Sequence, residues 1–580
     1  MNSFAKEYLL KLLRFDAESP LIFTGLYFWV FFTLVFTVFA ALQNRITWRN
    51  FFLFLTSIFF YYKTSNLYFV LLLFTVCSDF VIGHRLYKSH KPIVRSLLLA
   101  LSVTLNLFIL FYFKYAYFFT ESYNALFGSE YRVLNYFAVF EHSITGKGSI
   151  ADRIILPVGI SFYTFQAISY TTDIYKKRLK PLNNLFDFGF YVSFFPQLVA
   201  GPIVRASEFI PQMHRKYRLS GYQFGLALFM ILTGLLKKMV FGDYMAVQFI
   251  DKVFADPISY PGFANLMAVF AYSLQVYLDF SGYTDIAIGV ALLMGFRFNT
   301  NFNSPYKALN VGEFWKRWHI SLSTWLRDYL YIPLGGNRKG SWASYILILF
   351  MLAVFILLLD HTEWFVYAGI GVAVIAMLAW FFPGFKRHID TNINLMITML
   401  LGGFWHGSTW NFVVWGGLNG VGLVAYKYMH RLGKALRGSI PGKQCNALFV
   451  RVFKASSILH RVYQYGWRAL QILLTFGFIT FTRIWFRAPD KETADLVLDK
   501  IGFDMDWSLA FQILEGYDKV FILFTLGMIV HWLPHNWKRR YRLWFIKSPV
   551  WVKLIVVLLC IFAIWQTLSA EFVPFIYFQF

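Results

Sequence analysis

Long apolar runs separated by short polar loops organise most of this chain. A helix needs about 20 apolar residues to cross a hydrocarbon core of ~30 Å. Continuous runs of this kind indicate helices rather than the alternating strands of a membrane barrel. The pattern predicts an all-α polytopic membrane protein with roughly 11–14 crossings or half-crossings. The predicted spans fall at about 21–43, 51–62, 66–83, 96–119, 154–181, 219–240, 262–296, 343–359, 364–382, 469–486, 519–533 and 549–569.

The stretch Thr391–Tyr426 contains no Asp, Glu, Lys or Arg, and His406 lies near its middle. As one helix it would be roughly 54 Å long at 1.5 Å per residue, which is too long for a single crossing. We therefore expect a break, either at one of the glycine pairs 402–403 and 416–417 or at Gly407. A broken apolar segment with a histidine at the break is typical of a functional site.

Two other segments depart from the pattern of simple spanning helices. Residues 188–204 include Pro196 and Pro202 and have basic loops on both sides. They predict a re-entrant loop, and the alternative is an ordinary span with a proline kink. Residues 302–340 mix charges with tryptophans and predict a short amphipathic or re-entrant helix at the cytoplasmic boundary.

Asp279 and Asp285 lie within the apolar run 262–296. Carboxylates in such a run are costly unless they are paired or face water. Six positions apart, they do not share one face of an unbroken helix, although Gly282 between them could allow a bend. Two interpretations stay open, namely buried ion pairs with basic residues elsewhere or a role near a substrate.

Charge along the chain indicates its orientation. Residues 1–20 have apolar positions at helical spacing and predict an amphipathic helix on the membrane surface, with no cleavable signal peptide evident. The slightly acidic loop 120–153 and the N-terminus are expected outside the cytoplasm, whereas the basic loops face it. Residues 486–502 predict an amphipathic helix outside the bilayer.

Composition supports the membrane class. The 580 residues are 58% hydrophobic and only 14% charged, against about 25% charged in soluble proteins. The net charge of +24 comes from basic residues in short loops, as the positive-inside rule predicts, rather than from a nucleic-acid surface. These charges could also attract an anionic cytoplasmic donor. Cys77, Cys445 and Cys560 are far apart, which disfavours a disulfide or a zinc site.

His319 and His406 are the histidines with the most suggestive surroundings. Each follows a tryptophan and precedes a serine and a tryptophan, in WHISLSTW and WHGSTW. A lone intramembrane histidine is often only a buried hydrogen-bonding residue, but two matching contexts favour chemistry. Neutral imidazole can take a proton from a hydroxyl, return it to a leaving group or carry an acyl group. Two histidines fall short of a catalytic zinc shell, and the sequence contains neither a Walker-type motif nor GxSxG.

Five segments, in chain order, resemble the membrane-bound O-acyltransferase (MBOAT) family, in particular its bacterial branch of alginate O-acetylation and teichoic acid D-alanyl transfer proteins. They cover most of residues 21–500 and read LPVGISFYTFQAISYTTDIYKK, SFFPQLVAGPIVR, YLDFSGYTDIAIGVALLMGFRFNTNFNSPYKALNVGEFWKRWHISLSTWLRDYLYIPLGGNR, NLMITMLLGGFWHGSTWNFVVWGGLNG and IWFRAPDKETA. The resemblance implies a ring of helices around a thinned centre with a tunnel. Residues 21–580 would form one such domain, with C-terminal helices at 469–580 and an extra apolar hairpin at 343–382.

The resemblance also implies O-acyl transfer, with acetyl-CoA or another acyl thioester as donor substrate and no bound cofactor or metal. His406 matches the family's catalytic histidine and would act as general base or transient acyl carrier. His319 matches its second histidine, on the cytoplasmic side, and would orient donor or acceptor. The residues expected to bind substrate are Trp405, Trp318, Ser321, Asn411, Lys316, Arg317, Arg327 and Asp328. The three basic ones are expected to meet CoA phosphates.

The resemblance places the chain in the cytoplasmic (inner) membrane, among lipids. Its expected partner is an extracytoplasmic SGNH-type acyltransferase or an exported or cell-envelope polysaccharide, and no nucleic acid. D-alanyl transfer from a carrier protein is one alternative. A transporter or flippase for a lipid-linked sugar is another, in which Asp279 and Asp285 would be essential and the histidines dispensable. A scaffold without chemistry is a third.

Overall fold

The structure is a computed structural model, which describes residues 15, 21–146, 148–198, 201–358, 364–438 and 457–567. Every regular element in these ranges is a helix, which confirms the predicted all-α class. Within them, seven helices are long and apolar enough to cross a membrane, or eight if one bent helix pair counts as a span. The chain is therefore a multi-pass membrane protein. The surface helix predicted for residues 1–20 lies outside the described residues, apart from Phe15.

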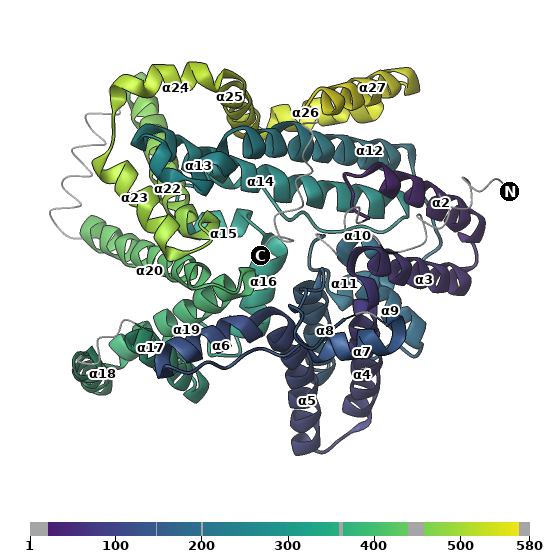
Figure 1. Cartoon of the computed structure of the whole chain (residues 1–580), viewed down its shortest axis with the longest axis horizontal. Coiled ribbons are helices and arrows are strands. Elements are labelled where there is room, and N and C mark those ends of the chain that lie inside the picture. The colour runs from purple at the N-terminus through teal and green to yellow at the C-terminus, as the bar shows by residue number, and fades with distance from the viewer. Residues whose placement is uncertain are drawn as a thin grey trace. The chain divides into compact units, whose positions relative to one another are not determined.

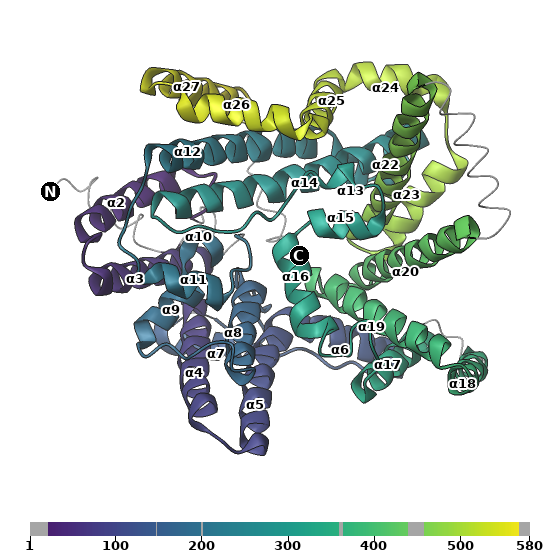
Figure 2. The ribbon, with the colours of Figure 1, turned by 180° about the vertical axis from the view of Figure 1, so that it is seen from behind.

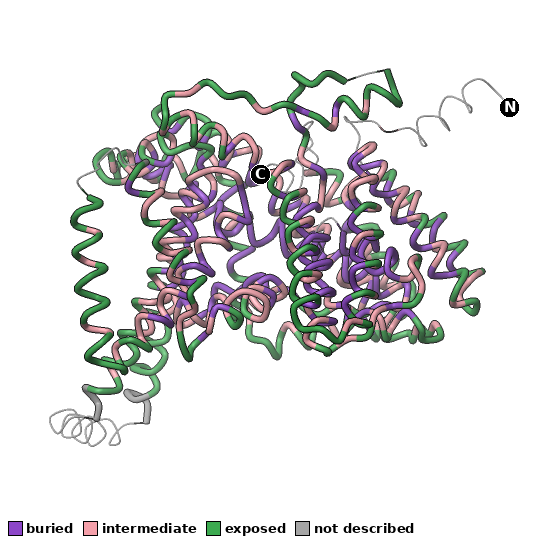
Figure 3. The backbone as a smooth tube through the Cα atoms, turned by 90° about the horizontal axis from the view of Figure 1, so that it is seen from below, coloured by how far each residue is buried: buried purple, intermediate pink, exposed green. Residues whose placement is uncertain are grey.

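The exposed surface of many helices is apolar. Large side chains such as Trp342, Trp380, Leu554 and Trp565 are well exposed, and exposed stretches run along many of the helices in Figure 3. In water, extended apolar surface of this kind promotes association. In a bilayer it contacts lipid, while the helical backbone satisfies its own hydrogen bonds. The surface thus agrees with the membrane assignment.

The described chain divides into two compact units. The first comprises the described parts of Met1–Asp243, Tyr277–Asn299 and His535–Gln579, and the second those of Tyr244–Val276 and Thr300–Pro534. Helix α14 (Gly262–Leu293) contributes residues to both.

In the first unit, α4 (Phe69–Lys88), α5 (Pro92–Leu110) and α8 (Ile160–Tyr175) pack side by side (Figure 1). Helix α8 is buried along almost its whole length. Helix α12 (Gly221–Leu235) lies beside α26 (His535–Lys547) (Figure 2). The other helices of this unit are α2 (Leu26–Leu42), α3 (Ile46–Ser65), α6 (Ala116–Phe127), α7 (Tyr136–Thr145), α9 (Leu185–Ser193), α10 (Phe195–Leu198), α11 (Ala206–Met213) and α27 (Val550–Thr567).

Residues 188–204 are interrupted, as their prolines predict. Helix α9 ends at Ser193, Phe194 leaves the helical conformation, and α10 begins at the next residue. Neither helix can cross a bilayer, because they are only 9 and 4 residues long and a crossing needs about 20. The residues around the break are buried, as irregular backbone at membrane depth requires. A re-entrant path through the membrane stays a prediction.

The two intramembrane carboxylates of α14 form ion pairs with α12 and its continuation. Asp279 contacts the Lys238 ammonium at 2.5 Å, and Asp285 contacts Lys237 at 2.6 Å. Asp243 also contacts Lys238, at 2.6 Å. The ion-pair interpretation of these aspartates is therefore confirmed.

Helix α14 continues without a break through Gly282. A Cβ at this position would lie 2.7 Å from the carbonyl oxygen of Gly234 on α12. The glycine therefore lets the two helices approach closely, which brings Asp279 and Asp285 within reach of the lysines.

In the second unit, α19 (Pro383–His406) and α20 (Trp410–Gly438) form an antiparallel hairpin (Figure 1). The remaining helices of this unit are α13 (Asp251–Ala255), α15 (Val311–Arg317), α16 (Ile320–Leu326), α17 (Trp342–Leu358), α18 (Trp364–Phe381), α22 (Ser457–Arg487), α23 (Lys491–Phe503), α24 (Ala510–Gly516) and α25 (Asp518–Trp532).

The predicted break in Thr391–Tyr426 occurs at Gly407, directly after the histidine. The glycine pairs remain helical and have a different role. A Cβ on Gly416 would lie 2.5 Å from the Met399 carbonyl oxygen, and one on Gly403 would overlap α20. Glycine at both positions therefore lets α19 and α20 pack backbone to backbone.

The polar segment 302–340 forms two short helices rather than one. Helices α15 and α16 have seven residues each and are separated at Trp318 and His319. The residues on both sides are helical, as the sequence predicts. His319 adopts a left-handed backbone conformation, with φ 42° and ψ 55°, which separates the two helices.

Two further predictions concern segments that flank these elements. The apolar hairpin 343–382 consists of α17 and α18, while the polar residues Asp360, His361 and Glu363 lie outside the described residues. The helix predicted at 486–502 is α23, which begins later because α22 continues to Arg487.

The ion pairs of α14 predict unequal effects on stability. The Lys238 and Asp279 side chains are 1% and 2% exposed, against 28% and 24% for Lys237 and Asp285. K238M removes the ammonium that contacts the buried Asp279 carboxylate and should lower the free energy of unfolding by about 3–5 kcal/mol. K237M should lower it by about 1 kcal/mol or less. Unfolding in detergent measures both.

The double variant K238M/D279N removes one uncompensated charge and should recover part of the stability that K238M loses. Equal destabilisation by the two single substitutions would contradict this assignment.

Candidate active site

The two histidines from separate sequence motifs lie together in the second unit. The centroids of the His319 and His406 rings are 6.4 Å apart. His319 immediately precedes α16, and His406 is the last residue of α19. Their side chains are buried, with 0% and 2% of each residue exposed. A reacting group held between them would be within reach of both, because a proton transfer needs heavy atoms about 2.6–3.2 Å apart.

Asn301 supports the unusual backbone at His319. Its side-chain oxygen accepts hydrogen bonds from the backbone N–H of Ser321 at 3.0 Å and from the Ser321 hydroxyl at 2.9 Å. Its backbone carbonyl accepts from the Ile320 N–H at 2.9 Å. These bonds satisfy donors at the start of α16 that the helix itself leaves open. They offset the cost of about 1–3 kcal/mol expected for a left-handed non-glycine residue.

Asn301 also determines which nitrogen of His319 carries the proton. The Nδ1 atom of His319 lies 3.3 Å from the Asn301 side-chain oxygen. This oxygen is identified as the acceptor because a backbone N–H points to it. Nδ1 must therefore donate, which leaves Nε2 with the lone pair. His319 is outside the seven candidate spans, and complete burial lowers the pKa of its imidazole to about 3. It is thus a neutral ring whose Nε2 lone pair can accept a hydrogen bond.

Aromatic side chains enclose His406. Its ring centroid lies 5.0 Å from Trp405, 5.0 Å from Trp415 and 5.4 Å from Phe486. Gly407 makes the tight exit from α19 possible, because a Cβ there would overlap the Phe412 ring. The surroundings exclude bulk water and keep the imidazole in an apolar environment.

The other residues predicted to bind substrate fall into two groups. Trp318 and Trp405 are buried beside the histidines, and Ser321 is tied to Asn301 as described above. The charged residues lie on α15 and directly after the end of α16. Two local ion pairs form there, Arg317 with Glu313 at 2.7 Å and Arg327 with Asp328 at 2.7 Å. Lys316 and Arg327 are exposed. These positions are open to a large anionic ligand at the surface, and phosphate binding stays a prediction.

Asn411 joins helices in the described structure. Its side-chain amide donates to the carbonyl oxygens of Ala488, at 3.0 Å, and Asp490, at 2.7 Å. These bonds hold the start of α20 against the end of α22, where Phe486 contacts His406. Asn411 can therefore influence the site by positioning the segment that carries Phe486. Direct contact between Asn411 and a substrate stays a prediction.

Four residues of this cluster were not predicted from the sequence, namely Asn301, Trp415, Phe486 and Arg483. Arg483 lies inside the apolar stretch 469–486, so the rule that identified the two intramembrane aspartates would have identified it as well. Its guanidinium carbon is 4.5 Å from the Trp318 ring centroid and 5.0 Å from that of Phe486. The sequence gives no comparable reason to select Asn301, Trp415 or Phe486, because residues of these types are common in their segments.

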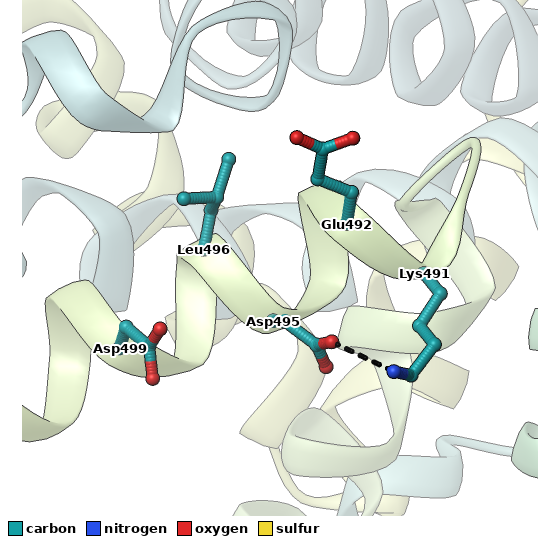
Figure 4. A pocket seen from close by; sticks show the side chains of 5 residues that line it. All are labelled: Lys491, Glu492, Asp495, Leu496 and Asp499. Carbon is teal, nitrogen blue, oxygen red and sulfur yellow. Dashed lines mark ion pairs between the residues drawn. The ribbon is translucent and has the colours of Figure 1, made fainter.

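A separate hollow lies on the surface of α23 and is open to solvent (Figure 4). It is lined by Lys491, Glu492, Asp495, Leu496 and Asp499, and Lys491 pairs with Asp495 at 3.4 Å. All five side chains come from one exposed helix face, which is typical of a solvated amphipathic helix. The buried histidine cluster, by contrast, combines residues from several helices, and we take it as the candidate active site.

The fold and the site define a class, a polytopic membrane protein with a buried pair of histidines. Comparison with known proteins identifies the family. The family model described as "MBOAT, membrane-bound O-acyltransferase family" matches residues 175–374. A peptidoglycan O-acetyltransferase of Helicobacter pylori is 31% identical over 470 residues, covering 77% of this chain and 72% of that protein. The chain belongs to the membrane-bound O-acyltransferase family, a family of acyltransferases, as the sequence motifs predict.

Two further relatives represent the branches that the motifs resemble. A protein named "Probable alginate O-acetylase AlgI" of Azotobacter vinelandii is 40% identical over 328 residues, which cover 56% of this chain and 52% of that protein. A teichoic acid D-alanyltransferase of Bacillus subtilis is 26% identical over 288 residues, covering 49% and 62%. The match to the alginate relative thus spans about half of its length.

The role of Asn301 can be tested through the pH dependence of acyl transfer. A carboxylate in N301D would stabilise protonated His319 and raise its pKa from about 3. Activity that needs the neutral ring should then be lost at a higher pH as the solution is acidified. N301A should lower activity at least about tenfold, because the tautomer is no longer fixed.

T324V removes a hydroxyl that bonds only within α16, so it should leave the pH profile unchanged. An unshifted acid limb in a folded N301D variant would argue against the assigned contact between Asn301 and His319.

Proposed function

We propose that this protein transfers an acetyl group from a cytoplasmic acyl thioester, with acetyl-CoA as donor, toward a hydroxyl of a cell-envelope or exported polysaccharide. The observation that carries the proposal is the pair of buried histidines with ring centroids 6.4 Å apart. The Helicobacter relative, an O-acetyltransferase by name, supports acetyl as the group and an envelope polymer as the destination. The proposed location is the cytoplasmic membrane.

His406 serves as the general base or as a transient acyl carrier. As a base, its imidazole takes the proton of the attacking hydroxyl while the oxygen bonds to the thioester carbonyl carbon. The carbon–sulfur bond then breaks, its electron pair stays on sulfur, and the imidazolium returns the proton to that sulfur. As a carrier, the imidazole nitrogen attacks the thioester carbonyl carbon first, the carbon–sulfur bond breaks, and the sulfur leaves with its electron pair and takes the ring N–H proton. The hydroxyl oxygen then takes the acyl group from the nitrogen, and the hydroxyl proton returns to the ring. His319, neutral and held by Asn301, orients the thioester or the hydroxyl.

The final acceptor is either the polysaccharide itself or an extracytoplasmic SGNH-type acyltransferase that passes the group on. The relatives act on chemically different polymers by name, alginate, peptidoglycan and teichoic acid. An acyl group is what they have in common. The buried site supports this common step, because it offers proton transfer in an enclosed apolar setting.

Loss of His406 tests the proposal directly. Membranes that contain the protein and its envelope acceptor should incorporate label from radioactive acetyl-CoA. H406A should abolish this incorporation, since a general base or carrier contributes at least about 100-fold. Normal thermal unfolding in detergent would show that the variant is folded. Unchanged incorporation by folded H406A would exclude the proposed role.

The charge-balanced variant K237Q/D285N separates acyl transfer from transport. Both charges lie in one ion pair, so acyl transfer should persist when they are removed together. A transporter for a lipid-linked sugar would show the opposite result, with the histidines dispensable and the aspartates essential. Label from a D-alanyl carrier protein in place of acetyl-CoA would instead identify D-alanyl transfer.

A further inference from the structure

Arg483 is a buried cation at the histidine cluster. It lies near the end of α22 and is 1% exposed, so its guanidinium is enclosed by protein. Among the residues that the structure describes, its three side-chain nitrogens make no hydrogen bond. Arginine stays charged in proteins, so this group cannot avoid the problem by losing a proton. A buried charge of this kind requires a partner with an oxygen acceptor.

Three aromatic rings surround the guanidinium and offset part of its desolvation. Its central carbon lies 4.5 Å from the Trp318 ring centroid, 5.0 Å from Phe486 and 5.7 Å from Trp415. Contact with ring faces is favourable to a cation, but it leaves the N–H groups of the fork without acceptors. The rings therefore hold the arginine in place while its donors remain available to a ligand.

The same rings connect Arg483 to the catalytic pair. Phe486 and Trp415 are also walls of the His406 site, with ring centroids 5.4 Å and 5.0 Å from the imidazole. Trp318 directly precedes His319 in the chain. The guanidinium and the two imidazoles thus face one aromatic enclosure within the second unit.

Arg487, one helical turn further along α22, provides an internal comparison. It pairs with Asp251 at 2.7 Å and also contacts the Phe254 and Tyr272 rings. This arginine has both an aromatic setting and a carboxylate. Arg483 has an aromatic setting but no carboxylate partner among the described residues, although it is more deeply buried. The difference indicates that the oxygen partner of Arg483 comes from a substrate.

We propose that Arg483 binds the carbonyl oxygen of the acyl thioester and stabilises the oxyanion that forms on it. This inference rests on the proposed acyl transfer. When the nucleophile, hydroxyl oxygen or imidazole nitrogen, bonds to the carbonyl carbon, the π electron pair moves to the carbonyl oxygen. The guanidinium N–H groups hold that negative charge. The pair returns as the carbon–sulfur bond breaks, and the sulfur takes the proton held by His406. One buried cation matches one developing negative charge.

The carbonyl fits this position better than a CoA phosphate does. Phosphates are multiply charged and strongly hydrated, and they lie at the far end of the pantetheine arm from the thioester. The exposed basic residues Lys316 and Arg327 suit them instead. A site of aromatic rings with one cation suits a neutral group that becomes charged only during the reaction.

Kinetics of Arg483 variants with two donors test the proposal. The donors are acetyl-CoA and S-acetyl-N-acetylcysteamine, a short thioester without phosphates. R483Q should lower kcat by about 10²- to 10³-fold with both donors, as loss of an oxyanion donor does, and change KM by less than about threefold. R483K should retain part of the activity, because it keeps the charge but not the fork. Guanidinium ion added to R483A should restore a measurable fraction of kcat.

R487Q is the matched control, since it removes an arginine of the same helix that already has a carboxylate partner. Its kcat should stay within about threefold of the unmodified protein. A KM increase for R483Q that is seen with acetyl-CoA and absent with the short thioester would overturn the proposal in favour of phosphate binding. A kcat for R483Q equal to that of the unmodified protein would also overturn it.

Failure of the proposed acyl transfer and failure of the proposed role of Arg483 would give different results. If the unmodified protein transfers no acyl group from either thioester or from membranes supplied with acetyl-CoA, the proposed function itself falls. If the unmodified protein is active and folded R483Q is equally active, only the role of Arg483 falls. A lowered unfolding temperature together with lost activity that guanidinium does not restore would assign Arg483 a structural role and overturn its role in catalysis.

Discussion

Ionisable and polar groups buried in an apolar protein need partners, and this constraint accounts for the most informative contacts of the structure. Lys238 is almost fully buried and meets two carboxylates, those of Asp243 and Asp279. Asn301 satisfies the donors at the start of α16 and one nitrogen of His319. The Arg483 guanidinium has no hydrogen-bond partner among the described residues, so we infer that a substrate oxygen supplies it. Chemistry is therefore expected where the pairing within the described chain is incomplete.

Close packing of helix backbones positions the paired and reactive groups. Gly234 and Gly282 bring α12 against α14, and Gly403 and Gly416 bring α19 against α20. A further glycine, Gly407, directly follows the end of α19. The hairpin turns there, and His406 is the last helical residue before the turn. Glycine thus allows two helices to pack closely at some positions and interrupts a helix at another. Which of the two occurs depends on the helix that packs against the glycine rather than on the glycine itself.

The site combines two kinds of electrostatic environment in a few helices. His319 is a neutral ring held by Asn301 and suited to orienting a reacting group, while the nearby Arg483 guanidinium provides fixed positive charge. Aromatic walls shared between them keep the dielectric low, so both act more strongly than they would in water. The members of the family named above modify different polymers, and this shared enclosure is suited to the acyl group that they have in common rather than to any one acceptor.

The sequence alone determined the membrane class, the all-helical fold class and the family, and it singled out the two histidines as candidates. It could do so because apolar run length and local motifs are properties of neighbouring residues. It also showed that Thr391–Tyr426 must break, but three glycine positions were equivalent until α20 was seen packing against α19. Tertiary structure alone decided that Asp279 and Asp285 pair with lysines, that α15 and α16 are separate, and that Asn301, Trp415, Phe486 and Arg483 join the histidines. These are contacts between residues distant in the chain, and local pattern carries no information about which partner a buried charge or ring will meet.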